Sequence, residues 1–242
     1  GQRKMVFRVV RRRKLYEEVA EQIEAAIASG HFEIGDQLPS ERDLMDRFGV
    51  GRPAIREALL LLERMGLVHL SPGEKARVTK PTIHGLVEQL SGAARHFLAT
   101  PRGEASFQDA RRVFESGIAY NAAIIATDED IAVLEKALEA NRQAMGNMAE
   151  FEKTDIRFHV ELTKIGGNPI FLALHTALVD WLSLQRFISL KIPGVAEEAF
   201  ESHKAIFDAI AAHNASAAWT AMDDHLRQVF RNLDHARVQG VA

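Results

Sequence analysis

The 242-residue sequence contains no cysteine and no apolar run approaching the ~18 residues of a transmembrane helix. The absence of cysteine excludes disulfide bonds and thiol catalysis. The absence of a long apolar run excludes a membrane-spanning segment, and the basic start, GQRKMVFRVVRRRKL, lacks the apolar core of a secretory signal. We therefore expect a cytoplasmic protein that has no membrane partner.

A large net charge is also absent, but the small total hides an asymmetry. The formal net charge is −3, whereas residues 1–82 contain 15 Lys and Arg against 12 Asp and Glu, and residues 83–242 contain 15 against 21. A basic first part and an acidic second part suggest different partners for the two parts. The alternative is that such a small basic excess has no functional meaning unless a motif supports it.

The first part begins with a predicted amphipathic helix. Between Leu15 and Gly30, where the helix is expected to stop, apolar residues recur every four positions and form the stripe Leu15, Val19, Ile23 and Ile27. Further along, the runs LVHL and ARVTK flank SPGEK and predict two short strands joined by a turn.

Two more helices are predicted between the first helix and this hairpin. Ser40 and Asp43 have the spacing of a capping box for a helix over about 40–47. Arg52 and Pro53 then open a third helix, because proline is tolerated in the first turn, where its missing N–H costs little. Three helices followed by a small hairpin is the element order of a winged helix-turn-helix, which binds DNA.

The third helix has the features of a recognition helix. Arg52 and Arg56 lie one turn apart, outside an apolar stripe that consists of Ile55, Ala58, Leu59 and Leu62. Arginine can donate two hydrogen bonds to guanine O6 and N7. Arg42 on the preceding helix, and Lys75 and Arg77 at the hairpin, are placed to reach phosphates or a groove edge. The alternative is that all five are solvated side chains on a small helical domain.

The stretch LPSERDLMDRFGVGRPAIREALLLLERMGLV resembles the signature of the GntR family of bacterial transcription regulators. The resemblance implies a winged helix-turn-helix domain over residues 14–81 that binds double-stranded operator DNA. It also implies that Arg42, Arg52 and Arg56 contact the operator, and that Gly73 marks the tip of a wing that enters the minor groove.

Two positions depart from the common pattern of that family. Gly51 stands where a serine is usual, and Pro53 stands where many members have threonine. Both departures remove hydroxyl groups, so any DNA contact from these side chains is lost. The basic residues 1–13 precede the domain and are expected to form an arm along DNA phosphates; the alternative is a solvated tail.

Residues 82–242 are predicted to form a separate domain made only of helices. Helical stretches alternate with breakers such as TPRGE, GGNP and IPG, over about 84–99, 105–126, 128–146, 148–165, 169–190, 195–213 and 215–238. Seven helices of this length indicate an antiparallel bundle, and the domain is long enough for one core. The predicted fold is therefore mostly α, a winged helix-turn-helix followed by an all-helical antiparallel bundle.

Four residues of this domain form a candidate metal site. Asp155 and His159 are four positions apart and share one face of a helix, while His203 and His225 lie on or beside the apolar stripes of two other helices. Buried imidazole and carboxylate groups are costly unless they are paired or bind a metal. The set suits Zn²⁺, with Ni²⁺ or Mn²⁺ as alternatives. The competing interpretation is an exposed Asp-His pair with two histidines at the edge of the core.

The second part also resembles the FCD domain, the effector domain of the FadR subfamily of GntR regulators. The matching motifs are R-x-x-x-E, D-x-x-x-H, G-N, H-x-x-I and H-L, over about residues 86–238. The resemblance implies that Asp155, His159, His203 and His225 bind a divalent metal and that an organic acid binds against it. Arg111 would meet the carboxylate of that acid and Asn168 would join the effector site; the alternative for Arg111 is an intrahelical pair with Glu115.

Longer phrases, such as IGGNPIFLALHTALVDWL, are similar to a subgroup of sialic-acid regulators within that subfamily. We therefore expect a homodimeric repressor of a sugar-acid or related catabolic operon, relieved by a small carboxylate effector. The first alternative is a DNA-binding regulator with a purely structural metal and no effector. The remote alternative is a metal-dependent helical-bundle enzyme, which would leave the DNA-binding domain unexplained.

Overall fold

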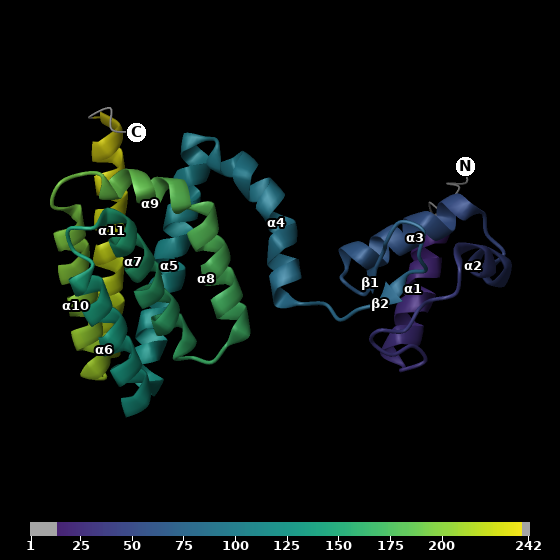
Figure 1. The fold of residues 1–242 in the computed structure, drawn as a ribbon, viewed down its shortest axis with the longest axis horizontal. Coiled ribbons are helices and arrows are strands. Elements are labelled where there is room, and N and C mark those ends of the chain that lie inside the picture. The colour runs from purple at the N-terminus through teal and green to yellow at the C-terminus, as the bar shows by residue number, and fades with distance from the viewer. Residues whose placement is uncertain (1–13, 239–242) are drawn as a thin grey trace, which may run out of the picture. The chain divides into compact units, whose positions relative to one another are not determined.

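A computed structural model describes residues 14–238, and the basic arm expected over residues 1–13 lies outside them. Within that range the protein is mostly helical, with one small sheet (Figure 1). The chain divides into two compact units between residues 89 and 90. The predicted domain boundary after residue 81 stays a prediction.

The first unit contains three helices and a hairpin: α1 (Leu15–Ala28), α2 (Glu41–Phe48), α3 (Arg52–Arg64), β1 (Val68–His69) and β2 (Arg77–Val78). This is the predicted winged helix-turn-helix order. The strands pair antiparallel, with Val68 opposite Val78. Residues 35–38 form backbone hydrogen bonds with β2 and the residue before it. The wing is therefore tied to the segment that precedes α2.

One apolar core holds this unit together. The predicted stripe on α3 is buried, and it packs with α1, α2 and both strands through Val19, Ala20, Ile23, Leu38, Leu44, Val68, Ala76 and Val78. Leu15 is an exception to the predicted stripe of α1, because it lies in the first turn of the helix and is exposed. The predicted capping box between Ser40 and Asp43 is present and fixes the start of α2.

The helix α4 (Ile83–Leu98) leads into a bundle (Figure 1) formed by α5 (Pro101–Ile125), α6 (Asp128–Gln143), α7 (Met148–Lys164), α8 (Pro169–Trp181), α9 (Ser183–Leu190), α10 (Val195–Ala211) and α11 (Ala215–Val238). An apolar core fills the space between α5, α6, α7, α10 and α11. The all-helical bundle was predicted, and the capping boxes and N-caps at Thr127 and Asn168 begin their helices as expected.

Two details of the predicted helices are wrong. TPRGE is the first turn of α5 and not a breaker, because Thr100 caps the helix and Pro101 occupies its first turn. Gly103 is required there, since a Cβ atom at this position would lie 1.8 Å from the carbonyl oxygen of Phe97. The predicted helix over 169–190 is two helices, which meet at the fully buried Leu182 although no glycine or proline marks the break.

Candidate DNA-binding surface and candidate metal centre

The recognition arginines lie on the exposed side of α3. Gly51 is the N-cap of this helix and has no side chain that could form a capping hydrogen bond. The side chains of Arg52 and Arg56 are 64% and 67% exposed, and the carboxylate of Glu41 lies 3.6 and 3.8 Å from their Nε atoms. Both arginines are therefore held over the start of α2 by a weak, solvated contact and remain accessible to another anion.

The other predicted DNA-binding residues surround this helix. Arg42 on α2 is exposed, and so is Lys75 in the wing. Gly73 has a φ of 78°, which is a left-handed conformation that a wing-tip turn can use and that other residues rarely adopt. Arg77 is also exposed, but its Nη1 donates to the carbonyl oxygen of Gly35 at 2.6 Å, so this side chain has a structural contact in addition to any contact with DNA.

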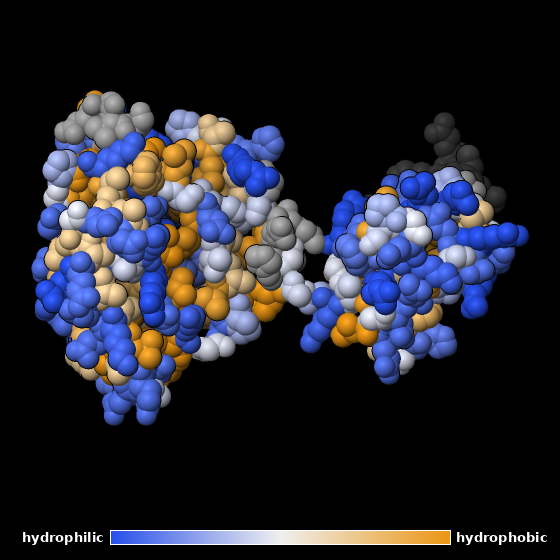
Figure 2. Space-filling view, in the orientation of Figure 1, coloured by the Kyte–Doolittle hydropathy of each residue, from blue (hydrophilic) through white to orange (hydrophobic). Residues whose placement is uncertain are grey.

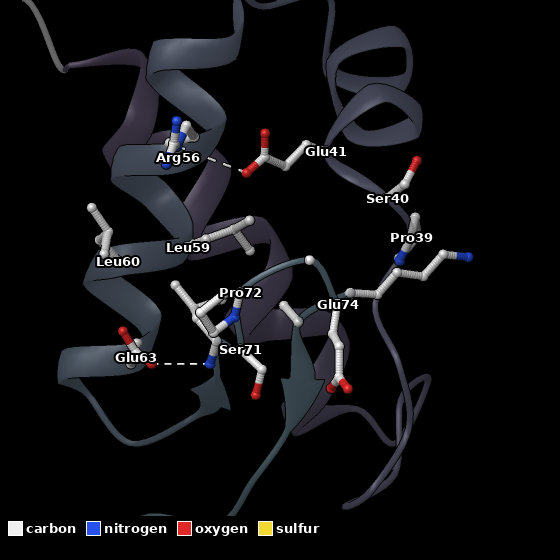
Figure 3. Close-up of a pocket in the computed structure, with 14 residues that line it drawn as sticks. Pro39, Ser40, Glu41, Arg56, Leu59, Leu60, Glu63, Ser71, Pro72 and Glu74 are labelled. Carbon is white, nitrogen blue, oxygen red and sulfur yellow. Dashed lines mark hydrogen bonds and ion pairs between the residues drawn. The ribbon is translucent and has the colours of Figure 1, made fainter.

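A cleft of about 560 Å³ separates α3 from the wing (Figure 3). Arg56 and Glu41 lie at one side of it, and the loop from Ser71 to Lys75 lies at the other. Glu63 accepts a hydrogen bond from the backbone N–H of Leu70 at 2.9 Å, which ties the end of α3 to the wing. The wing is therefore held at a defined distance from the recognition helix.

The interior of the bundle contains an unusual group of charged and titratable residues. Each is at most 6% exposed, and together we call them the buried polar cluster: Arg111, Glu115, Asp155, His159, His175, Arg186, His203 and His225. They come from α5, α7, α8, α9, α10 and α11. A cluster of this kind is expensive to bury, so it requires internal partners or a bound ion.

The three predicted histidine ligands meet in this cluster. One nitrogen each from His159, His203 and His225 lies within 4.8 Å of the other two. Burial is the main cause that lowers the pKa of His203 to about 3 and holds the pKa of His225 well below its usual value. Neutral imidazole is the form that binds a metal, so burial prepares these side chains as ligands.

A chain of hydrogen bonds through Thr154 and Asn141 decides which ring nitrogen of His203 carries the proton. Thr154 donates its hydroxyl proton to backbone carbonyls, so its oxygen accepts from Nδ2 of Asn141 at 3.1 Å. The Oδ1 atom of Asn141 is then turned to Nδ1 of His203 at 2.9 Å, and Nδ1 must donate to it. Nε2 of His203 therefore carries a lone pair.

Asp155 supplies the strongest sign of a cation site. Its Oδ1 lies 3.3 Å from Nε2 of His203, and no hydrogen bond joins them among the described residues. Two acceptors face each other at this distance, which is unfavourable unless a cation lies between or beside them. Burial would raise the pKa of Asp155, but nearby positive charge, including that of Arg186 at 3.3 Å, outweighs it and lowers the pKa. The carboxylate is thus ionised and suited to a metal.

Arg111 and Glu115 form an intrahelical pair, but not at the surface. Nε of Arg111 donates to Oε1 of Glu115 at 2.6 Å, and both side chains are buried. Oε2 of Glu115 lies 2.7 Å from Nδ1 of His159, a close electrostatic contact without the alignment of a hydrogen bond. Burial opposes ionisation of Glu115, but Arg111 and His159 outweigh it and hold the pKa of Glu115 well below its usual value.

Four members of the site were missed or underrated from the sequence. His175 and Arg186 were not predicted, Asn141 was not considered, and Glu115 was treated only as a partner of Arg111. Glu115, His159 and His175 form a second group whose ligand atoms lie within 4.8 Å of one another. A signal did exist, since His175 and Arg186 are, with Asp180, the titratable residues of the largely apolar stretch IFLALHTALVDWLSLQRFISL.

The described residues fit a divalent cation. Neutral His159 has one acceptor nitrogen, and both of its ring nitrogens, like Nε2 of His203 and Oε2 of Glu115, are buried without a hydrogen-bond partner in the described part of the chain. Buried polar atoms are nearly always satisfied, so this concentration of unpartnered nitrogen and oxygen acceptors indicates a site for a metal such as Zn²⁺. The Oδ1 atom of Asn168 accepts from the N–H of Ile170 at 2.9 Å and caps α8.

The two units thus define the class of the protein. It has a winged helix with exposed arginines and a helical domain whose buried side chains are suited to binding a metal. Residues 15–78 match the gntR family of bacterial regulatory proteins, and residues 107–228 match the FCD domain. The chain belongs to the gntR family and carries an FCD domain.

Two curated relatives are described as the HTH-type transcriptional repressor NanR. The protein from Klebsiella aerogenes is 45% identical over 92% of this chain and 86% of its own length, and that from Escherichia coli K12 is 45% identical over 92% and 85%. Such relatives are transcription regulators and not enzymes. The enzyme alternative is therefore set aside.

Solved structures support the same fold. Streptococcus agalactiae GntR matches with a TM-score of 0.58 and 23% identity, over 89% of this chain and 99% of that chain. Escherichia coli McbR/YncC matches with a TM-score of 0.52 and 18% identity, over 93% and 99%. In the described part of the chain, every helix falls short of the length or the apolar character needed to cross a membrane.

Proposed function

We propose that the protein is a ligand-responsive transcriptional repressor of an operon for the catabolism of a sugar acid, such as a sialic acid, or of a related carboxylic acid. Arg42, Arg52 and Arg56, with the wing residues Gly73, Lys75 and Arg77, bind the operator. A carboxylate effector binds in the helical domain and relieves repression. The names of the relatives support the repressor part of this proposal.

The observation that carries the effector part is the acceptor pair at the centre of the bundle. Nε2 of His203 and Oδ1 of Asp155 face each other with unshared electron pairs, and His203 also groups with His159 and His225. These four residues would hold a divalent metal, which supplies positive charge and open positions for an acid. Arg111 is buried beside them and is placed to neutralise the carboxylate of that acid.

An alternative role within the same class is a regulator whose metal only stabilises the bundle. The pairing of Arg111 with Glu115 favours an effector-binding site. Glu115 also contacts His159, so the pair keeps the positively charged guanidinium of Arg111 near the histidines. A metal site that only stabilised the bundle would not need this second positive charge. Asn168 remains a predicted effector contact, although its side chain is engaged as the N-cap of α8.

We also propose that the protein acts as a homodimer that presents two recognition helices to two half-sites. The helical domain has exposed apolar residues on α5, where Val113, Tyr120 and Ile124 are each at least 44% exposed. In Figure 2 the visible face of the first unit is mostly hydrophilic, whereas hydrophobic groups are more frequent on the visible face of the second. A second copy of the chain would cover such a surface, and light scattering would measure the mass.

The test of the proposal compares metal-loaded and chelated protein. Thermal unfolding is measured with N-acetylneuraminate, hexuronates, aldonates, lactate and citrate, and DNA release is measured in parallel. An acid at a hundred times its Kd should add about 2.7 kcal/mol of stability. One acid that stabilises only the loaded protein and releases DNA supports the proposal. Stabilisation by metal with no response to any acid supports the structural-metal alternative.

A further inference from the structure

After the acceptors are assigned to a metal, a charged donor, the guanidinium of Arg186, remains unused in the buried polar cluster. Nη1 and Nη2 of Arg186 are buried and have no hydrogen-bond partner among the described residues. An unsatisfied buried donor costs about 1–3 kcal/mol, and more when it is charged. Arg186 is 5% exposed, so bulk water does not offset this cost.

The contacts of Arg186 divide its guanidinium into two parts. Nε lies 3.3 Å from Oδ2 of Asp155, whose other oxygen faces His203. This contact holds the carboxylate in place and uses one edge of the guanidinium. The two Nη atoms form the remaining fork, whose geometry matches an oxygen acceptor or a planar oxyanion.

The charges of the cluster indicate that an anionic or oxygen-rich group is needed. Without a metal, the positive charges of Arg111 and Arg186 balance the negative charges of Glu115 and Asp155. A divalent cation at the histidines then leaves an excess of two positive charges in a buried site. Arg111 and Arg186 also lie close enough for repulsion between them to lower the pKa of Arg186, after the larger effect of burial. One carboxylate at Arg111 and the metal offsets only part of this excess.

We propose that Arg186 is a second effector-binding residue, which binds an oxygen group of the effector other than the carboxylate held by the metal and Arg111. The effector is then an acid with a second oxygen acceptor, such as a hydroxyl, carbonyl or carboxylate group, and not a simple monocarboxylate. This inference rests on the proposed function, because it adds a second contact to the same effector site.

The competing role for Arg186 is that it only positions Asp155. The two roles differ in what a substitution changes. A positioning residue affects metal affinity and the binding of every acid, because all of them depend on Asp155. A residue that binds the second oxygen group affects only the acids that have such a group.

The experiment uses the full-length, metal-loaded protein and three six-carbon acids in titration calorimetry. Hexanoate has one carboxylate and no other oxygen, gluconate adds hydroxyl groups, and adipate adds a second carboxylate. We expect gluconate, adipate or both to bind at least about tenfold more tightly than hexanoate, since a charge-assisted contact is worth about 1.5–3 kcal/mol and 1.4 kcal/mol is tenfold. Preference for gluconate identifies the group as hydroxyl, and preference for adipate identifies it as carboxylate.

The same titrations are repeated with Arg186→Lys and Arg186→Gln, and with Arg157→Gln as the matched control, because Arg157 on α7 is 68% exposed. We expect both Arg186 variants to lose the preference for the oxygen-rich acid, and we expect metal content and hexanoate binding to stay unchanged in the lysine variant, which keeps a positive charge beside Asp155. The lysine variant keeps the charge beside Asp155 and loses only the fork, so it tests the donor geometry even where the glutamine variant folds poorly.

Two results overturn the inference and leave the proposed function standing. The first is equal binding of all three acids to the unsubstituted protein. The second is a parallel loss of metal affinity and of binding to every acid in the lysine variant. Binding of no acid at all to the metal-loaded protein, N-acetylneuraminate included, overturns both the inference and the effector part of the proposed function.

Discussion

The two units place their charged residues in opposite ways. In the first unit the core is entirely apolar, and the predicted DNA-binding arginines lie outside it with more than half of the side chains of Arg52 and Arg56 exposed. In the second unit the bundle has an apolar core but also contains the buried polar cluster, which includes two arginines and two carboxylates.

The proposed function explains this difference by two kinds of partner. DNA is a large polyanion that arrives with its own solvation, so exposed arginines on a rigid scaffold are sufficient to meet it. A small acid offers few atoms, and each contact must be strengthened by the exclusion of water. Four predictions test whether the two units are as independent as this comparison suggests.

The largest effect is expected for His203→Ala. This change removes the imidazole that faces Asp155 and leaves Asn141 without its buried partner. Metal affinity should fall by more than the ~10–100-fold typical of an outer-shell change, and effector binding should be lost with it. Metal analysis and calorimetry measure the loss, and DNA binding in the absence of effector should persist. Unchanged metal content would remove His203 from the site.

The next effect is expected for Arg52→Ala and Arg56→Ala in the first unit. Each arginine is proposed to contact base edges, and a good bidentate contact is worth about 1–3 kcal/mol, or roughly 5–150-fold in affinity. The measurement is binding to a duplex selected by the protein from random DNA, with nonselected DNA for comparison. Arg142→Ala on α6 is the control, since that arginine pairs with Glu139 at the surface of the other unit. Equal losses for the control would mean that charge alone matters.

A smaller loss, of metal affinity, is expected for Asn141→Ala, a change next to the buried polar cluster. Asn141 orients His203 and does not lie among the proposed metal ligands. Metal affinity should fall about tenfold, as for other residues that orient a ligand. Asn232→Ala is the control, because Asn232 bonds Glu198 at an exposed position. If competition with a chelator shows no difference between the two variants, the orientation derived for His203 is wrong.

The smallest effect is expected for Glu41→Gln. Glu41 lies 3.6 and 3.8 Å from the Nε atoms of Arg52 and Arg56, and it competes weakly with DNA for them. Removal of its charge should raise DNA affinity about two- to threefold at low salt, because exposed ion pairs contribute 0.2–1 kcal/mol. The gain should shrink as salt screens the pair. A loss of affinity would instead show that Glu41 orients the arginines for binding.

Local sequence was enough to predict most of the fold. The apolar stripe of α3, the capping boxes at Ser40 and Thr127 and the N-cap at Asn168 are each decided by residues a few positions apart, and the structure contains all of them. The start of α5 was misread for the same reason, because Thr100 and Pro101 have a local pattern that suits both a breaker and a helix start.

The sequence by itself also determined which histidines are candidates, since His203 and His225 lie along apolar stripes of their helices. Only the tertiary structure decided that His175 and Arg186 share their site, that Asn141 orients His203, and that the Arg111–Glu115 pair is buried. It also divided α8 from α9 at Leu182, where the chain carries no breaker. The physical reason is that burial and the distance between side chains on different helices depend on how the helices pack, and no single helix encodes that.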